Sequence, residues 1–305
     1  MYEFMVLAAK VFPLYVIIFL GYIAGKKLRV DKDSVSTLLI YFIAPVVVFN
    51  GVASAFTDVR YLSLPILTLT LACLISGVFY LIAGRFFSGS ERGLVGFMSG
   101  TGNTGYFGLP VILALYGTAL QNIAILATLG FVLFENTVGY YYIAKHGLTT
   151  KEALIKVMRL PAIYAYILGI IANLVGYHPS QSSMDNIAYF RGAYVVLGMI
   201  IIGIGLAGVT MASIDKKLIV IAFSAKFIAF PAAVLFIRLV NAKIGFYSTE
   251  TMNVLLTLSA VPLASNTVSF ATKLKVHPEK TAFTVLASTI FALVYIPIIV
   301  SLFIK

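Results

Sequence analysis

The stretch SGTGNTGYFGLP, residues 99–110, interrupts a strongly apolar part of the chain with four glycines, two threonines, an asparagine and a proline. Gly100, Gly102 and Gly105 match the GxGxxG pattern, which needs a strand before the glycines and a helix after them. No strand pattern precedes this stretch. A second match, GIGLAG at 203–208, lies in another apolar run, where close helix packing accounts for the glycines. We therefore reject a nucleotide site.

The composition is that of an integral membrane protein. Of the 305 residues, 61% are hydrophobic and 11% are charged, and the mean hydropathy is +1.01. Soluble domains carry about 25% charged residues, and a soluble chain of this length could not bury so much apolar surface. The formal net charge is +11, but the basic residues cluster at the ends of apolar runs, which is typical of membrane orientation signals. We expect the lipid bilayer, and no nucleic acid, as a partner.

Apolar runs of membrane-spanning length recur along the chain. A spanning helix needs roughly 20 mostly apolar residues, and backbone groups in lipid must be satisfied within the segment. We therefore expect an all-α polytopic protein with ten transmembrane helices. The expected spans are 4–25, 35–56, 61–83, 94–117, 120–143, 160–177, 187–210, 217–240, 251–272 and 281–303.

The basic residues predict the orientation of these spans. Fifteen lysines and arginines lie in the connectors after the odd-numbered runs, and six lie on the opposite side. Because cytoplasmic connectors carry the excess of positive charge, both termini are expected on the outer side. The expected location is the plasma (inner) membrane.

The connector 145–159 divides the chain into a first repeat, 1–144, and a second, 160–305. Within it, Thr149 precedes Glu152 by three residues, which is the spacing of a capping box. The connector is either a short helix on the cytoplasmic membrane surface or the solvated lead-in to the next span. Each half holds five runs, an odd number, so the second half must run with inverted topology. Two halves of opposite topology are typical of an inverted-repeat transporter.

The fourth run of each half carries an interruption, and the second is SAVPLASNTVSF, residues 259–270. In 99–110 four glycines, Pro110 and free polar side chains together exceed what helix packing requires, and 259–270 again holds a proline and an Asn-Thr pair. We therefore expect two discontinuous helices. Pro110 would begin one second half-helix, where its missing N–H costs nothing. In the other run Pro262 breaks the helix, and Ser265 or Asn266 would cap the half-helix that follows. Such helix N-termini carry partial positive charge and suit an anion.

Two charged residues lie inside apolar runs, Glu135 and Lys226. They are interpreted either as structural groups, paired with each other or held neutral by hydrogen bonds, or as a coupling site. In the second case Glu135 takes a proton, or Lys226 replaces a coupling cation. Asn50 could line the site or bond to a neighbouring backbone group. Arg191 and Arg238 lie near outer helix ends and are expected to snorkel.

Catalytic and metal-binding patterns are not found in the sequence. The lone Cys73 lies in an apolar run, and His146, His178 and His277 lie in polar connectors without the spacing of metal ligands. No histidine lies in a span where it could act as a base, and GxxxxGK[ST] is missing. We expect no metal, no cofactor and no enzymatic activity.

NTGYFGLP (103–110) and AVPLASNTVSFATKLKVHPEKTAFTVLAST (260–289) resemble the motifs of the auxin efflux carrier family, in the bile acid/auxin carrier-like superfamily. That family includes plant PIN-type auxin carriers and bacterial organic-acid permeases. The resemblance implies a 5+5 inverted repeat, scaffold and transport domains formed from both halves, and elevator-type carriage of small carboxylates. It implies that the broken helices cross at two prolines, Pro110 and Pro262, and that Asn103 lies in the binding site. The short central connector departs from the plant carriers, so auxin as substrate is not implied.

We therefore expect a secondary transporter of small organic anions, which are carboxylates and could be dicarboxylates or auxin-like acids. Asn103, Thr104, Gly105 and the half-helix ends would hold the carboxylate, with Asn266 and Thr267 opposite. Two alternatives remain: a sodium-coupled carrier of the bile-acid type, and a membrane sensor that binds a ligand without moving it. By analogy with the family, a homodimer is expected.

Overall fold

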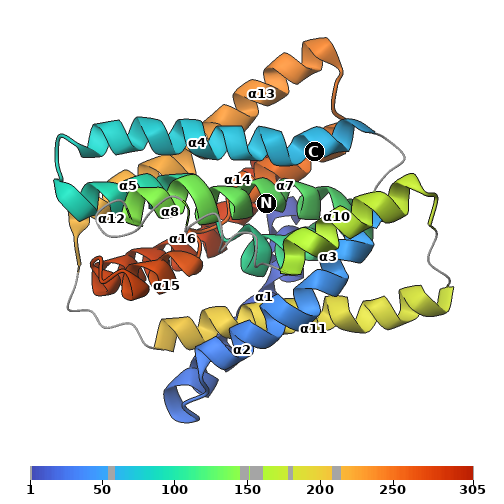
Figure 1. The fold of residues 1–305 in the computed structure, drawn as a ribbon, viewed down its shortest axis with the longest axis horizontal. Helices are drawn as coiled ribbons and strands as arrows, with labels where there is room; N and C mark the ends of the chain where they lie inside the picture. Colours follow the sequence, from blue (N-terminus) through green and yellow to red (C-terminus); the bar gives the residue numbers. More distant parts are fainter. Residues whose placement is uncertain are drawn as a thin grey trace.

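The computed structural model describes residues 2–53, 59–144, 151, 161–177, 181–207 and 214–304. Within these ranges every regular element is helical (Figure 1). Apart from Lys151, the connector 145–159 lies outside the described residues. Six described stretches are long and apolar enough to cross a membrane: Lys32–Ala53, Arg60–Ala83, Thr118–Ile143, Asp185–Ala207, Lys216–Ile244 and Pro278–Phe303.

One set of helices, here called group A, combines elements from both halves of the chain. Group A consists of α1 (Tyr2–Lys27), α2 (Lys32–Leu38), the π-helical turn η1 (Leu39–Ile43), α3 (Ala44–Ala53), α10 (Pro161–Leu174) and α11 (Gln181–Ala207). Helix α1 packs along α11, and α3 packs along α10. In Figure 1 the α2–α3 segment crosses over α11.

Glycines let the two long helices of group A approach closely. A Cβ atom on Gly203 of α11 would overlap the backbone of Ile18 in α1, and one on Gly21 of α1 would lie 2.8 Å from the Cα of Ile200. The small-residue contacts expected for the 203–208 stretch are therefore present at Gly203, which supports packing as its role.

The remaining helices, here called group B, pack around α4 and α7. Group B consists of η2 (Val59–Ser63), α4 (Leu64–Ala83), α5 (Gly89–Gly100), η3 (Thr104–Gly108), α6 (Leu109–Tyr116), η4 (Thr118–Leu120), α7 (Gln121–Phe134), η5 (Glu135–Gly139), α8 (Tyr140–Ala144), α12 (Lys216–Phe223), η7 (Ser224–Ala229), α13 (Phe230–Ile244), α14 (Thr249–Ser259), α15 (Asn266–Lys273) and α16 (Pro278–Phe303). Of these, α4 packs against both α5 and α7.

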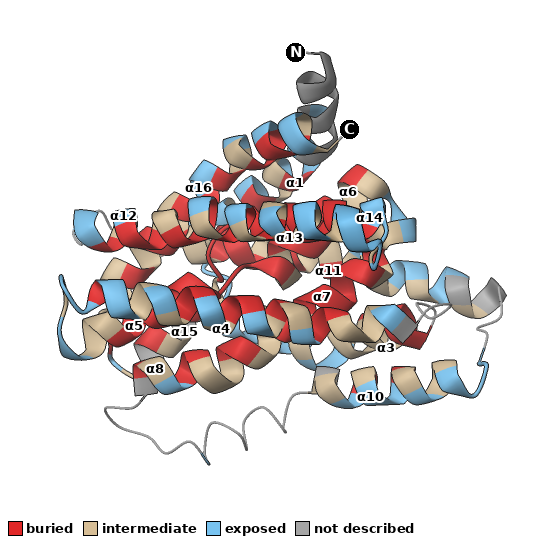
Figure 2. Cartoon of the chain, turned by 90° about the horizontal axis from the view of Figure 1, so that it is seen from above, coloured by how far each residue is buried: buried red, intermediate tan, exposed pale blue. Residues whose placement is uncertain are grey.

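Large apolar side chains cover the outer faces of the molecule. Phe12, Leu74 and Phe236 are each more than 60% exposed, and Figure 2 shows exposed positions on the outward faces of α4 and α10. Buried positions concentrate in inner helices such as α7 (Figure 2). An apolar exterior of this extent is unfavourable in water and favourable in a bilayer. The fold is that of an integral membrane protein.

Both expected interruptions are present, and they meet. Helix α5 ends at Gly100 and helical structure resumes at Thr104, while α14 ends at Ser259 and α15 begins at Asn266. The backbone N–H of Asn103 donates to the carbonyl oxygen of Pro262 at 2.8 Å. The two non-helical segments therefore satisfy part of each other's backbone hydrogen bonding. Non-helical backbone inside a membrane protein needs such partners, because lipid offers none.

The position expected for Pro110 was wrong. Pro110 is the second residue of α6, but the π-helical turn η3 precedes α6 without a gap, so the second half-helix begins at Thr104. A π-helical turn lengthens the hydrogen-bond spacing, which accommodates the N–H that proline lacks. The residue bonded to Pro262 across the interruptions is Asn103.

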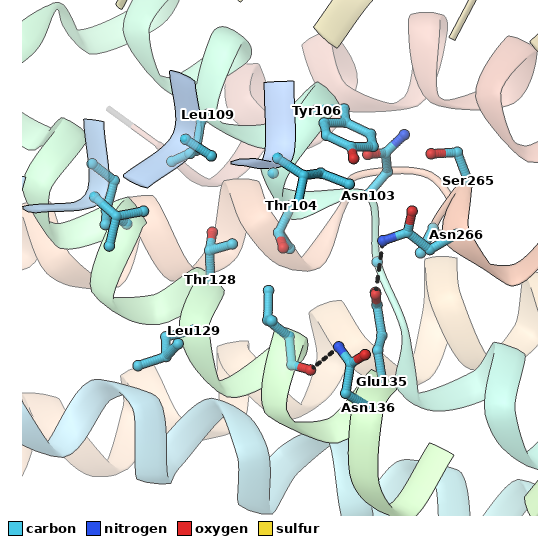
Figure 3. A pocket seen from close by; sticks show the side chains of 18 of the residues that line it. Asn103, Thr104, Tyr106, Leu109, Thr128, Leu129, Glu135, Asn136, Ser265 and Asn266 are labelled. Carbon is cyan, nitrogen blue, oxygen red and sulfur yellow. Dashed lines mark hydrogen bonds between the residues drawn. The ribbon is translucent and has the colours of Figure 1, made fainter. Parts of the chain in front are cut away.

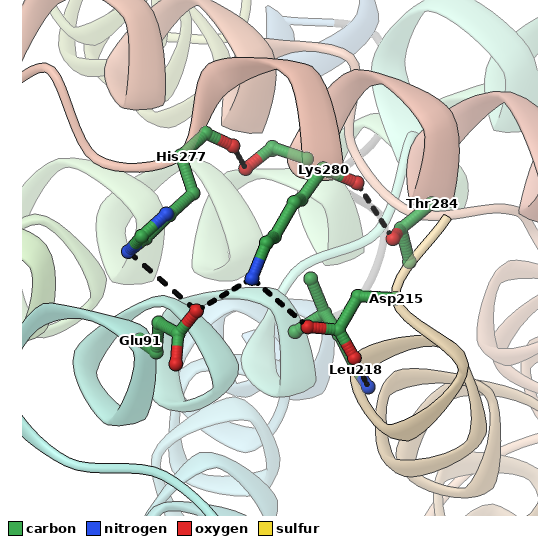
Figure 4. A network of polar contacts seen from close by, with 7 residues as sticks. Glu91, Asp215, Leu218, His277, Lys280 and Thr284 are labelled. Atoms are coloured by element: carbon green, nitrogen blue, oxygen red, sulfur yellow. Dashed lines mark hydrogen bonds and ion pairs between the residues drawn. The ribbon is translucent and has the colours of Figure 1, made fainter. Parts of the chain in front are cut away.

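A polar network ties three group B helices together at one end (Figure 4). The Nζ of Lys280 at the start of α16 donates to Glu91 of α5 at 2.7 Å and to Asp215, the N-cap of α12, at 3.1 Å. The His277 ring lies 3.6 Å from the same Glu91 carboxylate. The network fixes the ends of these helices relative to one another.

Candidate substrate-binding site

A cavity of about 280 Å³ lies between group A and group B. Small-molecule pockets span about 300–1,000 Å³, so this cavity suits a small ligand. Group A contributes Ile40, Ala44, Val48, Tyr166 and Tyr194 to its wall. Group B contributes Gly102, Asn103, Thr104, Gly105, Tyr106, Leu109, Ile125, Thr128, Leu129, Val132, Glu135, Asn136, Ala264, Ser265, Asn266 and Phe270. Both interruptions therefore open onto the cavity.

One end of the cavity is polar and rich in hydrogen-bond acceptors (Figure 3). The side-chain amide nitrogen of Asn266 donates to Glu135 Oε2 at 3.3 Å. The amide nitrogen of Asn136 donates to the carbonyl oxygen of Val132 at 2.8 Å. Because each amide uses its nitrogen as a donor, its oxygen is left to accept. Glu135 is almost fully buried, at 4% exposed, so its carboxylate needs a compensating proton or cation.

The opposite end of the cavity is apolar. Figure 3 places Leu109 and Leu129 on the side away from Glu135 and Asn266. Other apolar wall residues are Ile40, Ala44, Val48 and Ile125. Thr104 lies between the two ends in the same view. The cavity is thus amphipathic, with a charged group at one end and hydrocarbon at the other.

Lys226 lies on the other side of the first interruption and does not line the cavity. It is fully buried, and its Nζ has no hydrogen-bond partner among the described residues. A Cβ atom on Gly102 would lie 2.5 Å from this Nζ, and the Phe230 ring centroid lies 4.7 Å away. The ammonium group therefore sits beside the C-terminal end of α5, where a cation is stabilised by the helix dipole and the aromatic face.

The four π-helical turns that the described residues form coincide with this region. η1 carries Ile40, η3 carries Thr104 to Tyr106, η5 begins at Glu135, and η7 contains Lys226. π-helical turns are rare and are frequently found at functional sites. Their placement makes the cavity and the Lys226 position the candidate functional centre.

The structure brings several sequence-predicted residues together. Six line the cavity: Asn103, Thr104, Gly105, Glu135, Ser265 and Asn266. Five do not line it: Asn50, Pro110, Lys226, Pro262 and Thr267. Of the alternatives for Glu135 and Lys226, the mutual ion pair is not formed, since Glu135 accepts from Asn266 while the Lys226 Nζ has no hydrogen-bond partner in the described part of the chain.

The snorkelling expected of Arg191 was wrong. The Asn50 Oδ1 accepts a hydrogen bond from the Arg191 guanidinium at 2.7 Å. Arg191 therefore turns toward a buried amide within group A instead of snorkelling. Arg238 behaves differently, because it donates to the carbonyl oxygen of Phe303 at 2.8 Å near the end of α16.

Sequence reasoning did not single out five polar wall residues: Tyr106, Thr128, Asn136, Tyr166 and Tyr194. A signal existed for Asn136, since Asn136-Thr137 is an Asn-Thr pair inside an apolar run beside Glu135. Tyr166 and Tyr194 carry no such signal, because a tyrosine in a membrane span is more often an interfacial or packing residue.

Comparison with known proteins agrees with this architecture. A family model described as membrane transport protein matches residues 6–300. The chain is also similar to an uncharacterized transporter, MJ1031, from Methanocaldococcus jannaschii, with 28% identity over 273 residues, covering 86% of each chain. A match over nearly the whole length makes the protein a membrane transporter rather than an enzyme. The chain belongs to the membrane transport protein family, the auxin efflux carrier-like transporters.

Proposed function

We propose that the protein is a secondary transporter that carries small carboxylates by an elevator-type movement of group B relative to group A. The observation that carries this proposal is the position of the cavity, which lies between the two groups and is lined by both interruptions. A substrate held there would travel with group B, and the cavity would open to one side of the membrane at a time. The proposed architecture is ten spans in a 5+5 inverted repeat.

The carboxylate is proposed to bind at the first interruption. Helical residues run from Thr104 through η3 into α6, so the positive end of the helix dipole lies at Thr104 and Gly105. The Thr104 N–H already donates to the carbonyl oxygen of Gly102 at 2.7 Å, so the Gly105 N–H is the first-turn backbone donor proposed for the carboxylate. The Asn103 amide and the Thr104 hydroxyl add side-chain donors at the cavity wall. The apolar end favours a carboxylate with an apolar body over a dicarboxylate, because a second carboxylate there would find no donors.

Lys226 is proposed to take the place of a coupling cation. Its buried ammonium lies beside Gly102, near the end of α5, where a bound Na⁺ would otherwise neutralise the helix C-terminus. The carrier is therefore expected to work without sodium, unlike the bile-acid-type alternative. The charge of Glu135 must be neutralised separately, because a carboxylate substrate would bring a second negative charge into the same cavity.

The excess of lysine and arginine after the odd-numbered runs supports a plasma-membrane topology with both termini outside. Under this topology the Glu91–Lys280 network faces the cytoplasm.

Uptake into proteoliposomes tests the proposed function. The purified chain is reconstituted and offered labelled malate, indole acetate, 4-methylpentanoate and leucine, each with and without sodium. We expect sodium-independent uptake of at least one carboxylate that has an apolar body. Saturable binding without uptake of any of them would identify a sensor, and sodium-dependent uptake would favour the bile-acid-type alternative.

A further inference from the structure

We propose that the substrate is an α-amino acid with an apolar side chain, whose ammonium group binds at the polar end of the cavity. This inference rests on the proposed function, in which the same cavity carries a carboxylate. The ammonium would be bound by Glu135, Asn136 and Asn266, the carboxylate by the Thr104 end, and the side chain by the apolar wall.

The number and type of acceptors match an ammonium group. An ammonium offers three N–H donors and no acceptor. The hydrogen bonds to Val132 and to Glu135 fix the orientation of the Asn136 and Asn266 amides, so each amide oxygen remains an acceptor. Together with the Glu135 carboxylate they form three acceptors from η5 and α15, at one end of one cavity (Figure 3).

The charge of the cavity wall favours a ligand that carries a cation. Glu135 is the one acidic wall residue, and no lysine, arginine or histidine lines the cavity in the described ranges. The nearest buried cation, Lys226, lies behind Gly102 and makes no hydrogen bond with Glu135. A plain carboxylate would bring a second negative charge into a buried site, which is strongly unfavourable. A zwitterion adds no net charge to the cavity, and its ammonium group can pair directly with the Glu135 carboxylate.

The shape of the cavity accommodates all three parts of an amino acid. Its volume of about 280 Å³ leaves room for a side chain near Leu109 and Leu129. Thr104 lies between this apolar end and the acceptors (Figure 3). A carboxylate bound at Thr104 would therefore leave the α-carbon of the amino acid between its side chain and its ammonium group.

Matched ligands test the inference in the reconstituted full-length protein. L-leucine, 4-methylpentanoate and 3-methylbutylamine share one apolar body and differ in the presence of the ammonium and carboxylate groups. We expect leucine to be bound and taken up, with each analogue at least about tenfold weaker, because each leaves charged or polar wall groups unpaired. The same pattern is expected for L-phenylalanine, 3-phenylpropanoate and 2-phenylethylamine.

A substitution of the charged acceptor sharpens the test. Glu135→Gln keeps the size and one acceptor oxygen but removes the charge, so leucine binding should fall about tenfold or more while 4-methylpentanoate binding improves. Glu250→Gln is the matched control, because Glu250 is exposed at the start of α14. It should leave the affinity for both ligands unchanged.

Other outcomes separate the failure of this inference from that of the proposed function. Uptake of 4-methylpentanoate equal to or faster than that of leucine would overturn the amino-acid assignment and leave carboxylate transport intact. If that uptake required sodium, the acceptor cluster would be a Na⁺ site instead. If neither ligand bound to the folded protein, both the inference and the apolar-carboxylate substrate class would be overturned.

Discussion

The backbone N–H of Asn103 donates to the carbonyl oxygen of Pro262 at 2.8 Å, and this bond joins two helix interruptions that lie far apart in the sequence. It holds the Asn103 side chain at the wall of the cavity, beside the first turn of the helix that begins at Thr104. The bond uses backbone atoms, so the Asn103 side chain can be changed without removing it.

Asn103→Ala is therefore predicted to weaken substrate binding without unfolding the protein. Loss of one hydrogen bond to a charged ligand corresponds to about 1.5–3 kcal/mol, or roughly 10- to 100-fold in affinity. Asn241→Ala is the contrasting control, because Asn241 bonds twice to the backbone of Tyr247, at 2.8 and 2.9 Å. It should lower thermal stability in detergent and leave affinity unchanged. An Asn103→Ala variant with wild-type affinity would remove Asn103 from the site.

Lys226 is predicted to be required for transport because of its charge. Lys226→Met fills the same space without a charge, and uptake should fall about tenfold or more because the C-terminal end of α5 loses its cation. Lys226→Ala leaves space for a small ion, so sodium should restore part of its uptake but none of that of Lys226→Met. Uptake by Lys226→Met at the wild-type rate would show that the charge is dispensable.

Helix α11 offers a matched pair of glycines for a test of packing. Gly203→Ala would force a Cβ into the backbone of Ile18 in α1, whereas a Cβ on Gly192 would meet no atom within 4 Å. Overpacking costs about 1–3 kcal/mol, while alanine in an open helical position gains about 0.5–1 kcal/mol over glycine. Thermal unfolding in detergent should show Gly203→Ala destabilised and Gly192→Ala unchanged or stabilised. Equal stability of the two would contradict the close α1–α11 contact.

The Asp215–Lys280 contact predicts a pH-dependent part of the stability. Burial raises the pKa of Asp215, but the hydrogen bond from the Leu218 N–H and the charge of Lys280 outweigh it and hold the pKa below 3.8. A lowered pKa means that this contribution is present above the ordinary carboxyl pKa and is lost as pH falls through the lowered value.

The Asp215→Asn variant measures that contribution. It keeps an acceptor for the N-cap and removes the charge, so it should lose about 0.5–1 kcal/mol at neutral pH, since the pair is partly exposed and screened. Unfolding midpoints of the variant and the wild type should converge in acid. A difference that stayed constant down to the lowest pH would exclude Asp215 ionisation as its cause.

Local chemistry made the interruptions predictable from the sequence. Four glycines and Pro110 at 99–110, and Pro262 at 259–270, disfavour continuous helix, so the two breaks could be placed before any contact was known. The apolar composition likewise predicted a helical membrane protein. The start of the second half-helix was misplaced at Pro110, because the π-helical turn at Thr104–Gly108 has no established sequence signature.

Contacts between distant residues were not predictable in the same way. Glu135 and Asn266 meet through the packing of η5 and α15, and no local pattern links their positions. Asn50 and Arg191 pair inside group A. The position of Arg191 near a helix end suggested snorkelling instead, and nothing in the sequence near either residue pointed to the other. Tyr166 and Tyr194 reach the cavity wall only because α10 and α11 face group B there.

Cross-linking group A to group B tests the central claim most directly. In a Cys73→Ser background, Gly198→Cys and Tyr106→Cys would join α11 to η3, since a Cβ on Gly198 lies 3.6 Å from the Tyr106 Cβ, within the disulfide range of about 3.5–4.5 Å. Gly25→Cys with Ala207→Cys joins α1 to α11 inside group A and serves as the control. The corresponding distance there is 2.9 Å, shorter than the disulfide range, so α1 and α11 must move apart slightly to form the bridge. The account predicts that oxidation stops uptake by the Gly198–Tyr106 pair, that a reductant restores it, and that the control transports in both states. Undiminished uptake by a fully cross-linked Gly198–Tyr106 variant would contradict movement of group B relative to group A.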